Sequence, residues 1–206
     1  MIEDHSAHPL VQHHLTLLRD TQTPTSPFRH ATAALTQILV AEAAKTLSLR
    51  TFEVASPLET TSGAEIAGPV VFVPILRAGL GMLDAALSTI PHSSVGYIGM
   101  ERDEETAVAN CYYAKMPDLS AARQVYLIDP MLATGGSAIQ CIGQLKERGA
   151  TTISMICIIA APEGIECLQQ AHPDVRIVAG KVDRQLNHQK YILPGLGDFG
   201  DRLFQT

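Results

Sequence analysis

The stretch from Val125 to Ser137 places the tightest constraint on how this chain can fold. Its sequence, VYLIDPMLATGGS, has four apolar residues that end at Asp129, then a short loop that contains Gly135 and Gly136. Residues 138–149 follow with apolar side chains at helical spacing. We therefore predict a strand, a loop and a helix. Ligands of open α/β sheets lie beyond the carboxyl ends of the strands, and Asp129 falls at such an end.

The loop of this unit has the features of an anion site. Glycine lets the backbone turn tightly and approach a ligand closely. The N–H groups at the start of the helix, together with the hydroxyls of Thr134 and Ser137, would point into the same space and suit a phosphate. The stretch alone therefore predicts a site for a phosphorylated sugar or nucleotide.

Apolar patterns elsewhere predict the other elements of an α/β fold. We expect helices at 9–19 and 28–47, a helix that ends near 87, and one at 165–171; strands are expected at 49–55, 70–73, 94–100, 108–114, 153–159 and 175–179. The expected fold is a mainly parallel central sheet flanked by helices, in a single domain over residues 1–206. A loop is expected at 21–27, and residues 191–202 look too irregular for a helix or strand.

Composition narrows the class of protein. A chain of 206 residues fits one α/β domain. The net charge of −6, with acids and bases interspersed, argues against a protein that binds nucleic acid electrostatically. No apolar run approaches the roughly 20 residues that span a bilayer, and the acidic N-terminus lacks the basic start of a secretory signal. The four cysteines contain no C-x-x-C pair, which is typical of reduced thiols. We expect a cytoplasmic protein with no nucleic-acid or membrane partner.

Two arginines follow predicted strands. Arg77 lies in a glycine-containing turn after strand 70–73, and Arg102 lies among acids after strand 94–100. A guanidinium group grips phosphate oxygens as a fork. A solvated surface arginine is the alternative in both cases.

The C-terminal region has a different composition. Residues 191–202 contain three glycines, a proline and two aspartates. Such a loop offers backbone groups at close range to a small planar base. The alternative is a turn that only closes the fold.

Five motifs together resemble the uracil phosphoribosyltransferase family of type I phosphoribosyltransferases. They are PILRAGLGM at 74–82, RDEET at 102–106, DPMLATGGS at 129–137, AAPEGI at 160–165 and PGLGDFGDR at 194–202. They come in the family's order and spacing and cover most of the chain from about residue 8. The resemblance implies transfer of the 5-phosphoribosyl group from 5-phosphoribosyl 1-diphosphate (PRPP) to uracil. The implied products are UMP and diphosphate, as in pyrimidine salvage, with Mg²⁺ as cofactor.

The resemblance also implies a site with three parts. Its catalytic residues would be Arg77, Arg102 and Asp198. The implied PRPP-binding residues are Arg77, Arg102, Asp129, Pro130, Met131, Leu132, Ala133, Thr134, Gly135, Gly136, Ser137 and Asp198, and the implied uracil-binding residues are Ile192, Gly197, Asp198 and Phe199. PRPP would carry most of the Mg²⁺ coordination, with Asp198 as a candidate contact. Residues 180–206, together with the N-terminus, would form a hood over the base.

The chain departs from the family's pattern in three places. Phe199 stands where many bacterial members have alanine, Glu101 precedes Arg102 where an aromatic is common, and residues 184–190 lack a glycine often found before Tyr191. The general base for the uracil N1 proton stays open, with Asp198 as a candidate acceptor. The resemblance implies a homodimer or larger homo-oligomer and, for some relatives, a GTP effector. The sequence leaves both open.

Three alternatives remain. The first is a phosphoribosyltransferase for another nucleobase, which the segment at 194–201 disfavours. The second is a pyrimidine-sensing regulator that binds RNA on the same fold, which the acidic net charge disfavours. The third is an inactive homologue, which the intact loop after Asp129 and both arginines disfavour.

Overall fold

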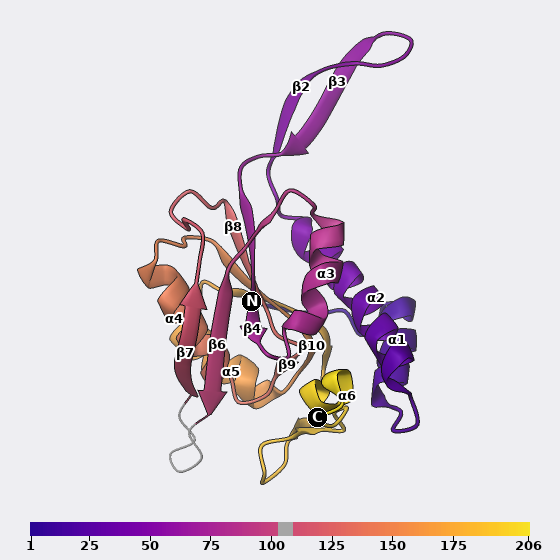
Figure 1. Ribbon diagram of the computed structural model, residues 1–206, viewed down its shortest axis with the longest axis vertical. Coiled ribbons are helices and arrows are strands. Elements are labelled where there is room, and N and C mark those ends of the chain that lie inside the picture. Colours follow the sequence, from indigo (N-terminus) through magenta and orange to yellow (C-terminus); the bar gives the residue numbers. More distant parts are fainter. Residues whose placement is uncertain (103–108) are drawn as a thin grey trace.

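The computed structural model describes residues 1–102 and 109–206, and a large sheet between two layers of helices forms its centre (Figure 1). The helices are α1 (Pro9–Arg19), α2 (Thr25–Ala44), α3 (Leu80–Thr89), α4 (Gly136–Glu147), α5 (Pro162–Ala171) and α6 (Phe199–Phe204). The strands of the large sheet are β1 (Ile2–Asp4), β4 (Val70–Leu76), β5 (Ser94–Val95), β6 (Tyr97–Arg102), β7 (Ala109–Lys115), β8 (Gln124–Ile128), β9 (Met131–Leu132), β10 (Ile153–Ala160) and β11 (Arg176–Val182). Two further hairpins pair β2 (Leu49–Ala55) with β3 (Thr60–Ile66), and β12 (Gln185–Leu186) with β13 (Ile192–Leu193).

The large sheet has the order β1–β11–β10–β8–β4–β6–β7, with β5 paired to β4 and β9 paired to β10. Among its described strands, β6 and β7 alone pair antiparallel. The expected mainly parallel sheet flanked by helices is therefore confirmed.

Both faces of the sheet are covered. Strands β8 and β10 are buried along their whole length, as expected for apolar strands with helices on both sides. Phe72, Tyr126 and Ile128 join one core with residues of α1, α2, α3 and α6. Val73 and Leu127 point to the other face and join a core with residues of α4 and α5. Figure 1 shows these two groups of helices on opposite sides of the strands.

The strand order reverses between β4 and β8. These strands pair in parallel, with Pro74 opposite Ile128. The chain leaves β4 through α3 towards β6, and it leaves β8 through α4 towards β10, on the other side. The two loops therefore diverge, and this arrangement opens a crevice at the carboxyl ends of the strands, where open α/β sheets bind their ligands.

The structure corrects two of the predictions about secondary structure. Helix α2 begins at Thr25, inside the predicted loop 21–27, because Pro27 occupies its first turn, where the missing N–H is not needed. The prediction that residues 191–202 contain no helix or strand is wrong, since β13 lies there and α6 begins there. The Asp198 carboxylate caps α6 by accepting a hydrogen bond of 2.9 Å from the Asp201 N–H.

All four cysteines are free thiols. In the described part of the chain, no helix combines the length and the apolar character needed to cross a membrane.

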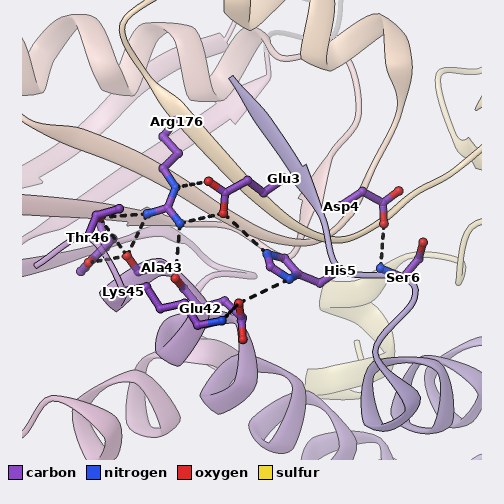
Figure 2. A network of polar contacts seen from close by, with 10 residues as sticks. Glu3, Asp4, His5, Ser6, Glu42, Ala43, Lys45, Thr46 and Arg176 are labelled. Atoms are coloured by element: carbon purple, nitrogen blue, oxygen red, sulfur yellow. Dashed lines mark hydrogen bonds and ion pairs between the residues drawn. The ribbon is translucent and has the colours of Figure 1, made fainter.

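The end of α2 is held by a polar network around Arg176, at the start of β11 (Figure 2). The guanidinium donates to both carboxylate oxygens of Glu3, at 2.6 and 2.7 Å, and to the Ala43 carbonyl at 2.9 Å. It holds the pKa of the Glu3 carboxyl below its usual value, mainly through these hydrogen bonds. His5 lies between Glu3 and Glu42, at 3.8 and 3.7 Å from their carboxylates. One cation therefore ties β1 and β11 to the C-terminal carbonyls of α2, where positive charge is favoured.

We expect Arg176→Ala to lower the free energy of unfolding by roughly 2–4 kcal/mol, because it leaves the Glu3 carboxylate and the helix carbonyls without this donor. The control is Lys146→Ala, which breaks the more exposed ion pair with Asp174 and should cost at most about 1 kcal/mol. Urea unfolding of both variants tests this. Equal losses would show that the Arg176 network contributes no more than a surface pair.

Candidate functional site

The first part of the site is a cavity over the loop between β8 and α4. It has a volume of about 230 Å³ and is lined by Asp129, residues 131–138 and Lys190. The structure thus brings together all the residues of 129–137 that were predicted to bind PRPP, except Pro130. The loop reaches the helix through Gly135, whose φ of +83° is a left-handed conformation that favours glycine.

Glycines also allow α5 to support this loop from behind. A Cβ on Gly135 would lie 2.9 Å from the Gly164 carbonyl oxygen, and a Cβ on Gly164 would collide with the Ala133 carbonyl. The Ala161 N–H donates to the Leu132 carbonyl at 2.9 Å. The AAPEGI motif therefore packs the first turn of α5 against the phosphate loop and fixes its shape.

Asp129 sits where β8 ends, on the wall of this cavity. Burial raises the pKa of its carboxyl to about 7, and a hydrogen bond from the Met131 backbone lowers it in part. The side chain is therefore poised to change its charge near neutral pH. Hydroxyl groups that donate to the carboxylate would favour its charged form.

The second part of the site is a cavity of about 250 Å³, lined by Arg77, Ala78, Met131, Tyr191 and residues 197–200. Met131 lines both cavities, so they adjoin. Gly79 allows the Arg77 loop to lie against the end of β8, because a Cβ there would be 2.6 Å from the Ile128 carbonyl oxygen. Arg77 itself is exposed.

The C-terminal wall of this second cavity is anchored by buried charge. The Asp183 side chain is fully buried, pairs with Arg19 at 2.5 Å and accepts the Gly195 N–H at 3.1 Å. Arg202 donates to the carbonyls of Leu18, Leu196 (2.7 Å) and Asp20 (2.6 Å). These contacts tie the loop at 194–200 to α1, which thereby supports the C-terminal wall of this cavity.

Two of the predicted residues whose side chains are described, Pro130 and Ile192, are not on the cavity walls. Pro130 is buried and its carbonyl accepts the Ile158 and Ile159 N–H groups. Ile192 is buried in the core. Arg102 ends β6, but its side chain lies outside the described residues, as do residues 103–108, which include the rest of the RDEET motif. Phe199 lines the second cavity, yet its ring packs in the core against Phe28, with centroids 5.3 Å apart.

The walls also contain residues that the sequence analysis did not select. These are Ala78, Ala138, Lys190, Tyr191 and Gly200. Ala78 and Gly200 lie inside the PILRAGLGM and PGLGDFGDR motifs, and Ala138 directly follows DPMLATGGS, so the motifs themselves point to these three residues. Lys190 and Tyr191 lie in the tight turn between β12 and β13, and that hairpin carries no strong apolar pattern.

The residues that line the two cavities fit a Mg²⁺ ion that would bind together with the phosphates of a substrate. No group of three or more metal-ligating side chains occurs within residues 1–102 and 109–206. The Asp129 and Asp198 carboxylates line the adjoining cavities. Mg²⁺ is usually held by one or two carboxylates together with substrate phosphates, so this arrangement suits it.

The fold and the two cavities define a type I phosphoribosyltransferase. The adenine phosphoribosyltransferase of Thermoanaerobacter pseudethanolicus shares this fold, with a TM-score of 0.56 at 11% identity over 84% of this chain and 99% of that one. The AQ2163 protein of Aquifex aeolicus is much more similar, with a TM-score of 0.94 and 38% identity over 99% of this chain and 98% of that one.

Sequence comparison gives the family. The uracil phosphoribosyltransferase profile matches residues 5–206. The uracil phosphoribosyltransferase of Streptococcus agalactiae serotype III (strain NEM316) is 48% identical over 201 residues, which cover 97% of this chain and 96% of that protein. The chain belongs to the uracil phosphoribosyltransferase family.

We expect Gly136→Val to abolish PRPP binding and leave the fold intact. A Cβ at Gly136 meets open cavity, with the nearest atom, Thr134 Oγ1, 3.9 Å away, so the larger side chain fills the phosphate space without disturbing the protein. Gly143→Val is the control, because it adds the same atoms to α4 where nothing lies within 4 Å. Calorimetry with PRPP and a thermal melt test both variants. Retained PRPP binding by a folded Gly136→Val protein would contradict the phosphate role of this loop.

We expect Asp129 to make the stability of the unliganded protein depend on pH. Its pKa in the fold lies above the roughly 3.9 of an unfolded aspartate. Its stabilising contribution is therefore complete below about pH 4 and is lost as the pH rises through about 7. Between pH 4 and 8 the wild type should lose roughly 1–4 kcal/mol relative to Asp129→Asn in urea unfolding. A constant difference between the two proteins would contradict the raised pKa.

Proposed function

We propose that this chain transfers the 5-phosphoribosyl group of PRPP to uracil, giving UMP and diphosphate in pyrimidine salvage. The observation that carries the proposal is the pair of adjoining cavities that share Met131. One cavity has a phosphate loop. The other has an arginine and a glycine-rich wall, and the volume of this cavity suits a small base. Membership of the uracil phosphoribosyltransferase family supports the same reaction.

The first cavity would hold the sugar end of PRPP. Backbone N–H groups of residues 133–137 and the start of α4 suit the 5-phosphate, and the Asp129 carboxylate suits the ribose hydroxyls. Binding energy from the phosphate then orients the reacting C1 carbon, which takes no direct part in these contacts. We therefore assign the loop a positioning function.

Breaking the bond between C1 and the diphosphate builds positive charge on the ribose and negative charge on the leaving group. Arg77, beside the shared wall at Met131, would stabilise the diphosphate, and Arg102 is proposed to assist it. A bound Mg²⁺ ion would neutralise part of the negative charge on the diphosphate. The protein needs no nucleophile of its own, because uracil N1 attacks C1 and the diphosphate leaves.

The second cavity would hold uracil against the backbone of residues 197–199. Because the Phe199 ring packs in the core and Ile192 is buried, these residues would act on the base through main-chain groups or by supporting the wall. The uracil N1 proton must leave during the reaction. Asp198 is the proposed acceptor, directly or through water, with its carboxylate held by the Asp201 N–H.

A product assay with several bases tests the function. The protein is incubated with PRPP, Mg²⁺ and uracil, hypoxanthine, adenine or orotate in turn, and we expect UMP as the main product. Arg77→Ala should lower kcat by about 10²–10³-fold with a smaller change in uracil binding. A purine nucleotide or orotidylate as the main product would contradict the base assignment. Tight binding of a pyrimidine-operon leader RNA without UMP formation would favour the regulator.

We further propose that the chain forms a homodimer or a larger homo-oligomer. Hairpin β2–β3 projects away from the helices and the large sheet in Figure 1, and most of its residues are exposed. Its exposed apolar side chains are Leu49, Phe52, Leu58 and Ile66. An isolated two-stranded hairpin is marginally stable in water, so cover from a second copy would stabilise it. Sedimentation equilibrium at micromolar concentration tests this proposal, and a measured mass equal to that of a single chain would contradict it.

Two further proposals concern the location of the protein and its regulation. A cytoplasmic location is supported by the four free cysteines. GTP as an effector rests on the resemblance alone, and its test is the UMP-forming rate with and without GTP at subsaturating PRPP.

A further inference from the structure

Lys190 differs from the other residues around the phosphate loop. It is the one basic side chain among the residues that line the first cavity, and it comes from the turn between β12 and β13, far away in sequence. Its φ of +68° is left-handed, a conformation that residues other than glycine, asparagine and aspartate rarely adopt. A lysine here therefore needs structural support.

The turn supplies that support. Asn187 accepts hydrogen bonds of 2.9 Å at its side-chain Oδ1 from the N–H groups of Gln189 and Tyr191. Its backbone carbonyl accepts the Lys190 N–H at 3.0 Å, and its N–H donates to the Tyr191 carbonyl at 2.8 Å. Four hydrogen bonds to one asparagine thus fix the backbone that carries Lys190.

The turn is also tied to the body that bears the phosphate loop. The Leu186 N–H donates to the Glu163 carboxylate at 2.9 Å, at the start of α5. The pKa of Glu163 lies below its usual value, first because of this hydrogen bond and also because the charge of Lys190 acts on it. Since α5 packs on the loop through Gly164, Lys190 is positioned relative to the phosphate cavity by a short series of contacts.

We propose that Lys190 binds the 5-phosphate of the substrate, from the part of the cavity wall that the turn between β12 and β13 forms. This inference rests on the proposed function. The ammonium group would add a charge-assisted hydrogen bond to a site otherwise built from backbone N–H groups and hydroxyls. Tyr191, the next residue, lines the second cavity, so the same turn borders both cavities.

The test compares UMP with uridine, which lacks the phosphate, in calorimetric titrations. Lys190→Asn removes the charge and keeps a residue that tolerates a left-handed backbone. We expect UMP affinity to fall roughly 5- to 20-fold, uridine affinity to stay unchanged, and Lys190→Arg to retain most UMP affinity. Lys115→Asn is the charge-matched control. Lys115 lies on β7 opposite Tyr97, the first residue of β6, at the other end of the strand from Arg102, so its charge is outside the proposed site.

The outcomes separate this inference from the proposed function. A wild type that binds UMP no better than uridine would overturn the proposed function. A wild type that prefers UMP, with Lys190→Asn preferring it equally, would overturn the inference alone. An equal loss of UMP and uridine affinity in Lys190→Asn would assign Lys190 a structural role and would also overturn it.

Discussion

The structure depends on the parallel pairing of β4 with β8. Pro74 opposite Ile128 brings two strand ends to one edge of the sheet, and the chain leaves them in opposite directions. Gly79 lets the loop after β4 approach the Ile128 carbonyl, so Arg77 and Asp129 belong to neighbouring cavities. A shift of this register would separate the phosphate loop from the arginine, and no loop sequence could restore the site.

The second constraint is the attachment of the C-terminal segment. Asp183 is a buried acid whose charge is compensated by Arg19 and by the Gly195 N–H. Arg202 then holds the end of α1 through backbone carbonyls. A buried carboxylate is costly without its partners, so these contacts favour one position of the wall formed by residues 197–200. Local hydrogen bonds alone would leave such a glycine-rich segment many conformations.

The sequence predicted the parts of the site that obey local rules. The strand, loop and helix around Asp129 follow from apolar spacing and glycine, and the structure confirms them. Helix α6 was missed because its glycines and aspartates suggest a turn, although Asp198 and Asp201 form its N-cap. Lys190 and Tyr191 were missed because their place depends on Asn187 and on contacts with α5, which no periodicity reveals. Burial of the Phe199 ring against Phe28 likewise depends on tertiary packing.

The central claim is that one ligand spans both cavities, with its phosphate on the loop after β8 and its base on the C-terminal wall. A crystal structure of the complex with UMP tests this most directly. We predict the phosphate oxygens within hydrogen-bond distance of the N–H groups of residues 134–137, and the uracil ring in contact with the backbone of residues 197–199. UMP bound in the reverse orientation, or away from Met131, would contradict the account.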